Sequence, residues 1–261
     1  MRKTEEGSTV AAERALRLLR LLAGNGEIRL TELSRELGLP HSTTHRLLAT
    51  LRREGFALQE AASKRYVAGP GMWELGWLLD PHGLRLAARP HLTALAEEFG
   101  EAAQLVVLQG RYVEFLDGVE SERQVKHGTR LGRPLPSHLV SGGKALLARL
   151  PGAILDRLYP DEELLTMTPA SVRTKSALLG QLARARELGY ATNVHETEVG
   201  VCAVGAAVVD RYGRARCGLV VAGPSTRLLP EDLPVVGERL AGAARVISEE
   251  LRFDDVSDRL R

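Results

Sequence analysis

The 261-residue chain has few cysteines, few aromatic residues and no long apolar run. Its two cysteines, Cys202 and Cys217, exclude a disulfide framework and a four-thiolate zinc site, so a reducing, cytoplasmic setting is expected. The N-terminus lacks the apolar core and the small-residue cleavage site of a signal peptide, and no stretch approaches the roughly 18 apolar residues of a membrane span. The sequence therefore predicts a cytosolic protein without a membrane partner.

The chain also has little net charge. A formal charge of +2 is too small to mark the whole chain as a nucleic-acid binder, so any DNA-binding surface must come from local clustering. The rest of the composition, 44% hydrophobic and 26% charged, is that of a soluble globular protein. The length suffices for two domains of ordinary size.

Enzyme motifs are missing as well. The run Gly-Gly-Lys at residues 142–144 is similar to the end of a phosphate-binding loop, but His138 and Ala145 stand where such a loop needs a glycine and a hydroxyl residue, so the motif is not matched. A nucleophile elbow, a His-Glu-x-x-His motif and a dinucleotide-binding glycine motif are all absent. One local group holds potential metal ligands, namely His195, Glu196 and Glu198. Since no second histidine or cysteine stands at ligand spacing, we interpret it as a polar loop. The sequence predicts no catalytic residue, no metal and no cofactor.

The strongest positive pattern lies at residues 39–55. From Thr44 onward, leucines recur at helical spacing on one side, and polar or basic residues occupy the other side. A shorter helix precedes it, with Thr31 as the expected N-cap and Gly38 as the stop. Two helices joined in this way predict a helix-turn-helix, whose second helix enters the DNA major groove.

The residues at the start of the second helix are candidates for reading DNA. Arg46 is the best single candidate for a base contact, because a guanidinium can donate to purine acceptors. The other candidates for base or phosphate contacts on this helix are His41, Ser42, Thr43, His45, Arg52 and Arg53. For any one of these side chains, the alternative of an ordinary solvated surface residue stays open.

The flanking segments complete a winged helix-turn-helix. We expect frayed residues at 1–8, a first helix from Val10 to about residue 24, and two short strands at 56–59 and 65–67 around a turn at 61–64. Lys64 and Arg65, at the tip and the return strand of this hairpin, are placed to touch the DNA backbone or the minor groove. Two solubilising surface charges are the alternative.

Residues 69–79 combine helix breakers with both tryptophans of the chain. Pro70 can occupy the first turn of a helix that is too apolar to stand alone. Such a helix packs on the DNA-reading domain or meets the same helix of a second copy, and a dimer suits a protein that reads two half-sites. We place the domain boundary here, with a first domain at 1–80 and a second at 81–261.

The second part of the chain mixes helices and strands. We expect helices at 84–99, interrupted by Pro90, at 170–188 and at 231–251, strands at 104–108, 112–116, 202–209 and 215–222, and an irregular loop at 130–144 that enters a helix at Ala145. Small residues at 203–207 and the glycine turn at 141–143 could leave a cavity for an anionic ligand. They could instead simply let a helix pack closely on a strand.

Three separate motifs together resemble the IclR-type transcriptional regulators. They are the helix-turn-helix LPHSTTHRLL, the segment Leu-Pro-Ser-His at 135–138 with Ser-Gly-Gly-Lys-Ala at 141–145, and a run from Gly189 to Leu228 that contains Gly-Val-Cys at 200–202 and Ala-Gly-Pro-Ser-Thr-Arg-Leu at 222–228. The likeness covers residues 10–250. It implies an α+β protein, a dimer or tetramer, whose C-terminal GAF-like domain binds a small organic metabolite, often a carboxylate, and so alters binding to a double-stranded DNA operator.

The resemblance also implies an effector pocket, carried over position by position. Its residues here are Gln124, His127, Leu135, Ser141, Gly142, Asn193, Ala203, Val220 and Ala222. Relatives can have a carboxylate where Asn193 stands, and hydroxyl or thiol side chains where Ala203, Val220 and Ala222 stand. The less polar pocket favours a bulkier ligand such as an aromatic acid, with Asn193, His127 and Ser141 orienting its polar end. Arg130 could balance a carboxylate, although an exposed position is the simpler interpretation.

The leading hypothesis is a ligand-responsive DNA-binding regulator that is not an enzyme. Repression is favoured over activation. Two alternatives stay open. The C-terminal domain could serve only for oligomerisation, or the chain could be an enzyme with an appended DNA-binding domain. The absence of catalytic motifs argues against the enzyme.

Overall fold

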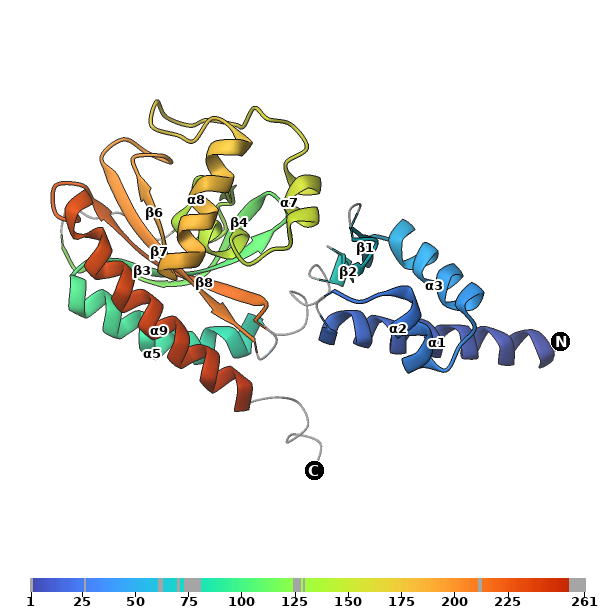
Figure 1. Ribbon diagram of the computed structural model, residues 1–261. Coiled ribbons are helices and arrows are strands. Elements are labelled where there is room, and N and C mark those ends of the chain that lie inside the picture. Colours follow the sequence, from blue (N-terminus) through green and yellow to red (C-terminus); the bar gives the residue numbers. More distant parts are fainter. Residues whose placement is uncertain are drawn as a thin grey trace. The chain divides into compact units, whose positions relative to one another are not determined.

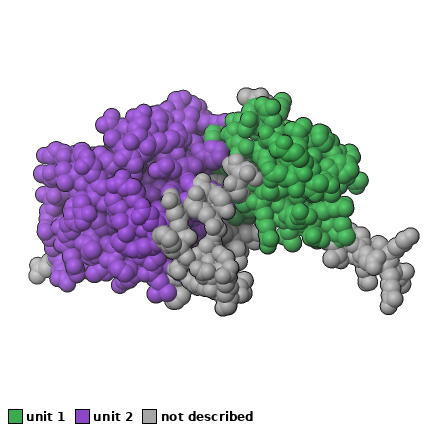
Figure 2. Space-filling model, turned by 60° about the horizontal axis from the view of Figure 1, so that its bottom comes forward, with its two compact units in different colours: residues 1–79, 152–154 green, residues 80–151, 155–261 purple. Residues whose placement is uncertain are grey.

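The computed structural model describes residues 2–25, 27–60, 63–69, 71–72, 81–123, 128, 130–210 and 213–253. The chain divides into two compact units, coloured separately in Figure 2, of residues 1–79 with 152–154 and residues 80–151 with 155–261. Among the described residues, no helix has the length and apolar character to cross a bilayer.

The first unit is a winged helix-turn-helix. Its elements are α1 (Arg2–Asn25), α2 (Leu30–Leu37), α3 (His41–Arg53), β1 (Ala57–Gln59) and β2 (Tyr66–Ala68). Gly38 closes α2 in the left-handed conformation (φ +65°), which glycine adopts without a steric penalty. The predicted helices and the hairpin are confirmed (Figure 1).

Two predicted helix starts in this unit are wrong. α1 begins at Arg2 rather than at Val10, and α2 begins at Leu30 with Arg29, not Thr31, at its N-cap. The start of α2 is determined by a local contact. The backbone N–H of Arg29 donates to the carboxylate of Glu32 at 2.9 Å, which places the N-cap two residues before the predicted Thr31. The predicted helix at 70–79 falls largely outside the described residues, as does half of the turn at 61–64.

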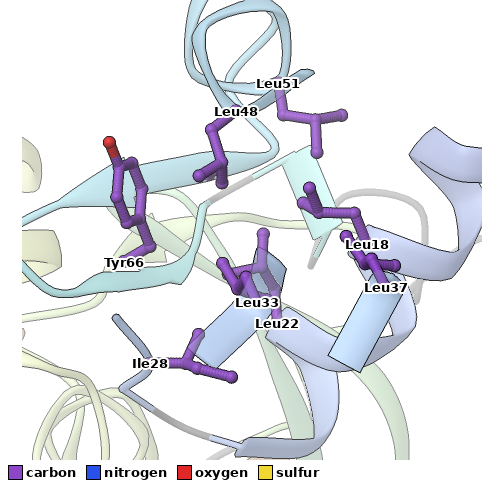
Figure 3. Packing of buried hydrophobic residues seen from close by; sticks show 9 residues of the cluster. Leu18, Leu22, Ile28, Leu33, Leu37, Leu48, Leu51 and Tyr66 are labelled. Atoms are coloured by element: carbon purple, nitrogen blue, oxygen red, sulfur yellow. The ribbon is translucent and has the colours of Figure 1, made fainter. Parts of the chain in front are cut away.

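Leucines at helical spacing form the core of the first unit, as Figure 3 shows. Leu18 and Leu22 of α1, Leu33 of α2 and Leu48 of α3 are at most 1% exposed. Each buried leucine contributes about 1.5–3 kcal/mol to folding. Backbone bonds between Ile28 and Tyr66, at 2.8 and 2.9 Å, attach the hairpin to the segment between α1 and α2. The hairpin is therefore fixed to the helices at its β2 side.

The second unit is an antiparallel sheet of six strands with helices on both faces. In chain order, the α-helices and strands described from residue 81 onward are α5 (Pro81–Phe99), β3 (Ala102–Gln109), β4 (Tyr112–Val119), β5 (Leu135–Pro136), α6 (Ser141–Leu147), α7 (Gly152–Leu158), α8 (Lys175–Leu188), β6 (Ala191–Val194), β7 (Val201–Val209), β8 (Ala215–Pro224) and α9 (Leu233–Phe253). The strand order is β5-β4-β3-β8-β7-β6. Helices α5 and α9 cover one face and α8 lies on the other (Figure 1), where α6 packs against β7, β8 and α8. The predicted α+β class is confirmed.

Several details of the second unit differ from the prediction. α5 runs through Pro90 without interruption, because Ala88 and Leu92 on either side are fully buried and their packing outweighs one lost helix bond. α6 begins at Ser141, four positions before Ala145, inside the segment predicted as a loop. Strand β6 and helix α7 were not predicted.

Candidate functional site

Helix α3 presents a polar face outward. His41, Ser42, His45 and Arg46 are exposed and Thr43 is partly buried, whereas Leu48 and Leu51 point into the core. The hydroxyl of Thr44, which is buried, donates to the carbonyl of Pro40 at 3.3 Å. The side chains that were predicted to face DNA are therefore the ones that the fold leaves accessible.

The basic residues beside this face are arranged unequally. Lys64 is exposed and Arg65 is partly buried in the hairpin. Arg53 bonds Glu54 at 3.0 Å, an exposed pair that is worth little in water. Arg52 donates through Nη1 to the side-chain oxygen of Gln59 at 3.2 Å. The residues predicted to contact phosphate thus differ in their exposure and in their hydrogen bonds to other protein groups.

Four strands of the second unit place predicted effector residues in one row. Asn193 pairs with Ala203, Ala203 with Ala222, and Ala222 with Ala102. Directly opposite residues share a face of a sheet, so three alanines lie side by side next to one amide. The row is buried. It lies on the face that α6 covers.

The neighbouring row holds Val220 and a residue that the sequence analysis missed. Val220 pairs with Gly205 on one side and with Gln104 on the other. Gln104 is 1% exposed, and its side-chain oxygen accepts from the backbone N–H of Arg130 at 3.1 Å. A lone amide within an apolar strand was the signal that could have identified it. Leu135, in contrast, lies on β5 at the opposite edge of the sheet from Asn193.

The first turn of α6 rests directly on the sheet. A Cβ added to Gly205 would lie 2.3 Å from the backbone nitrogen of Gly142, and one added to Gly142 would lie 2.5 Å from Val220. The small residues here therefore permit close packing of a helix, as the alternative interpretation stated. Ser141, at the start of α6, is fully buried, and its hydroxyl has no hydrogen-bond partner among the described residues.

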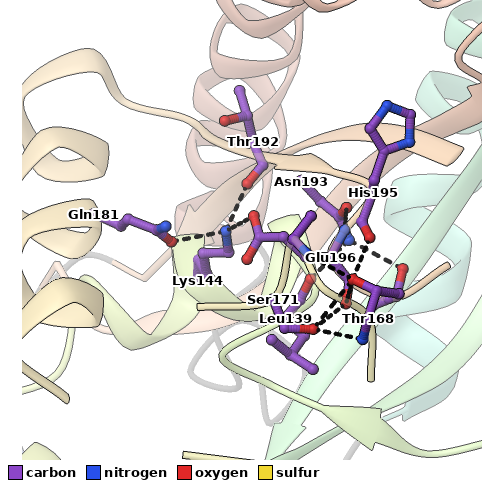
Figure 4. Close-up of polar contacts among 11 residues, drawn as sticks. Leu139, Lys144, Thr168, Ser171, Gln181, Thr192, Asn193, His195 and Glu196 are labelled. Atoms are coloured by element: carbon purple, nitrogen blue, oxygen red, sulfur yellow. Dashed lines mark hydrogen bonds and ion pairs between the residues drawn. The ribbon is translucent and has the colours of Figure 1, made fainter. Parts of the chain in front are cut away.

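Asn193 braces the loop that follows β6. Its side-chain nitrogen donates to the carbonyl of Leu139 at 2.7 Å and to the hydroxyl of Thr197 at 3.1 Å. Its side-chain oxygen accepts from the backbone N–H of Glu196 at 3.0 Å, in the network drawn in Figure 4. The amide connects the chain before α6 to the chain after β6.

A buried ion pair lies beside this brace. Lys144 of α6, 2% exposed, donates to Glu196 at 2.5 Å, to Gln181 at 2.8 Å and to the carbonyl of Thr192 at 2.9 Å (Figure 4). Burial lowers the pKa of the Lys144 ammonium and raises the pKa of the Glu196 carboxyl, and their mutual attraction opposes both shifts. No local sequence pattern indicates this pair, because its partners are 52 positions apart.

The remaining predicted residues have separate surroundings. Glu198 bonds Arg130 at 2.5 Å, and the Arg130 side chain is 21% exposed. Within the described parts of the chain, no three histidine, cysteine or acidic side chains converge as a metal site would require. Gln124 and His127 lie outside the described residues.

Comparisons with known proteins agree with this architecture. Residues 11–61 match the family model of the IclR helix-turn-helix domain, and residues 77–249 match that of the bacterial transcriptional regulator IclR C-terminal domain. The chain is 37% identical over 225 residues to the glycerol operon regulatory protein of Streptomyces griseus, covering 85% of this chain and 87% of that one.

Two further relatives extend the likeness over nearly the whole length. The chain is 29% identical to the transcriptional repressor IclR of Escherichia coli strain K12, covering 93% of this chain and 90% of that one. An IclR homologue from Microbacterium hydrocarbonoxydans, solved in complex with 4-hydroxybenzoate, shares 24% identity and the fold. The match has a TM-score of 0.61 and covers 94% of this chain and 100% of that one.

Proposed function

Because this chain belongs to the IclR family of bacterial transcriptional regulators, we propose that it is a ligand-responsive repressor that binds a double-stranded operator as a homodimer or homotetramer. The exposed polar face of α3, held on a leucine core, carries the DNA-binding part of this proposal. The E. coli relative named as a repressor supports the direction of the response. In this proposal the chain regulates transcription and catalyses no reaction.

For DNA recognition, the proposed base-reading residue is Arg46, with His41, Ser42, Thr43 and His45 beside it. Arg52, Arg53, Lys64 and Arg65 are the proposed backbone contacts. A residue that reads a base discriminates between sequences, whereas a residue that contacts phosphate binds every duplex alike. This difference separates the two roles experimentally.

We expect Arg46→Ala to weaken binding to a selected operator by about 10- to 100-fold and binding to unselected duplex much less, because it removes a base contact worth roughly 1–3 kcal/mol. Lys64→Ala should weaken both about equally. The measurement is fluorescence anisotropy of full-length protein, using a duplex recovered by selection from random sequences and the unselected pool. Equal losses on both duplexes for Arg46→Ala would contradict its role as a base reader.

For effector sensing, the proposed ligand is a small organic acid bound against the alanine row. Asn193, Ala203, Val220 and Ala222 share that face of the sheet, and Ser141 brings an unpartnered hydroxyl to the start of the covering helix. We propose that Gln124, His127, Leu135 and Gly142 complete the site. The alanine and valine side chains offer no hydrogen bonds, so few groups of the site can bind polar atoms of a ligand. An aromatic acid therefore suits the site better than a smaller, more polar acid.

We expect 4-hydroxybenzoate, the compound in the Microbacterium complex, to raise the melting temperature of the full-length protein more than pyruvate does. Ligand at about 100 times its Kd stabilises by about 2.7 kcal/mol. That corresponds to roughly 5–10 °C for a domain of this size. The matched compound is 4-hydroxybenzyl alcohol, which lacks the carboxylate and should give little shift. Ala222→Val should abolish the response by adding two methyl groups to the alanine row.

The contact between Gly142 and Gly205 favours one second candidate, a C-terminal domain that only oligomerises. In that case the sheet face is closed by α6, and no ligand enters. Absence of thermal stabilisation by any organic acid, from a protein that still forms a dimer and binds the operator, would favour this candidate.

A further inference from the structure

Gln59, the last residue of β1, bonds to groups on both sides of it. Its side-chain oxygen accepts from Nη1 of Arg52 at 3.2 Å, and its side-chain nitrogen donates to the carbonyl of Lys64 at 3.1 Å. Arg52 lies in the last turn of α3, and Lys64 lies at the turn of the hairpin. A carboxamide can both accept and donate, so one side chain connects the recognition helix to the hairpin turn.

Lys64, whose carbonyl Gln59 contacts, has a strained backbone conformation that its neighbours hold in place. Lys64 has φ +56°, a left-handed conformation that is unfavourable for a non-glycine residue. Backbone bonds hold it there: Lys64 N–H donates to Glu60 at 3.0 Å, and Glu60 N–H donates to Arg65 at 2.9 Å. The hydroxyl of Ser63 bonds the Glu60 carboxylate and also accepts from the backbone N–H of Arg65 at 3.2 Å. The backbone conformation of Lys64, from which its side chain starts, is thus held by its surroundings.

These two observations indicate that Gln59 restricts Arg52 and Lys64 together. A guanidinium that bonds Gln59 has its direction restricted before DNA arrives, and so does the carbonyl of Lys64. The bridge runs from the helix that carries Arg46 to the turn that carries Lys64. It therefore limits how far the proposed phosphate contact can move relative to the proposed base contact.

We propose that Gln59 is a positioning residue for DNA recognition, which fixes the hairpin turn relative to α3 so that Lys64 reaches a phosphate while Arg46 reads a base. This inference depends on the proposed DNA-binding function and adds to it a residue that touches no DNA itself. Without the bridge, Lys64 must be ordered on binding, and that ordering reduces the benefit of its contact.

The test is a double-mutant cycle between Gln59→Leu and Lys64→Ala in the full-length protein. The probe is the selected operator, and affinity is measured at several salt concentrations. We expect Gln59→Leu alone to weaken binding by about 5- to 10-fold and to reduce the salt slope by up to ~0.9, the contribution of one phosphate contact. In the Lys64→Ala background, Gln59→Leu should cause a much smaller further change, because the Lys64 contact is already gone and only the orientation of Arg52 remains to be lost.

Gln109→Leu is the matched control, since Gln109 is an exposed glutamine at the end of β3 in the other unit. It should leave affinity and salt slope unchanged. The proposal is overturned if the effects of Gln59→Leu and Lys64→Ala add. It is also overturned if Gln59→Leu lowers the melting temperature without altering the salt slope, which would indicate a purely structural role. If the proposed DNA-binding function is itself wrong, the results differ from these. No duplex is then enriched by selection, and Arg46→Ala weakens binding to every duplex alike or not at all.

Discussion

Lys144→Met is expected to lower the free energy of unfolding of the second unit by about 3–5 kcal/mol, because it leaves the Glu196 carboxyl buried without a countercharge. The variant should also depend on pH in a defined direction. Burial raises the pKa of Glu196 above its unfolded value of 4.5, so the folded state holds a proton that the unfolded state loses. The destabilisation should therefore grow as the pH rises above 4.5.

The measurement is urea unfolding of the full-length chain, with amide exchange assigning the transition to residues 81–253. Adding Glu196→Leu to Lys144→Met should recover most of the loss, since replacing both charges by apolar groups is often neutral. The matched control is Lys175→Met, which breaks a 2.7 Å pair with an Asp156 side chain that is 69% exposed. It should cost less than about 1 kcal/mol. A loss for Lys144→Met no larger than this control would contradict a structural role for the buried pair.

Gly205→Ala is expected to cost about 3 kcal/mol, at the upper end of the range for overpacking. The new Cβ would lie 2.3 Å from the backbone nitrogen of Gly142 and 2.5 Å from its Cα, and backbone cannot swing aside as a side chain can. Alanine also restricts the unfolded chain, which favours folding by roughly 0.4–1 kcal/mol, but the clash outweighs it.

The control for this substitution is Gly180→Ala, the same chemical change on the exposed side of α8. A Cβ there meets nothing within 4 Å, so the variant should gain about 0.5–1 kcal/mol through helix propensity. Opposite signs for the two variants in urea unfolding are the expected result. If Gly205→Ala is neutral, α6 can move away from β7 at little cost.

Local patterns were sufficient to predict the first unit. Leu33, Leu48 and Leu51 recur at helical spacing, and Gly38 marks a helix end, so each element could be assigned from residues close in sequence. The start of α2 was wrong because a backbone bond to Glu32 caps the helix instead of the Thr31 hydroxyl. Such a choice between neighbouring caps depends on small energy differences.

The second unit could be predicted only in part, because its contacts join distant residues. Gly-Gly after Ser141 is typical of a loop, yet α6 starts there because Gly142 and Gly143 must lie against Val220 and the backbone of Ser137. Pairing between β3 and β8 decides which side chains share a face, and no local pattern carries that information. For the same reason no local pattern indicated that Gln104 would bond Arg130 or that Lys144 would pair with Glu196.

The order of strands also has a consequence for synthesis. β8 lies between β3 and β7, so a strand near the end of the chain joins the two halves of the sheet. A ribosome therefore completes the winged helix-turn-helix while β3 still has an unpaired edge. A chain that stops before residue 215 contains every strand of the winged helix-turn-helix hairpin but lacks the strand that joins β3 to β7, so the six-stranded sheet cannot form.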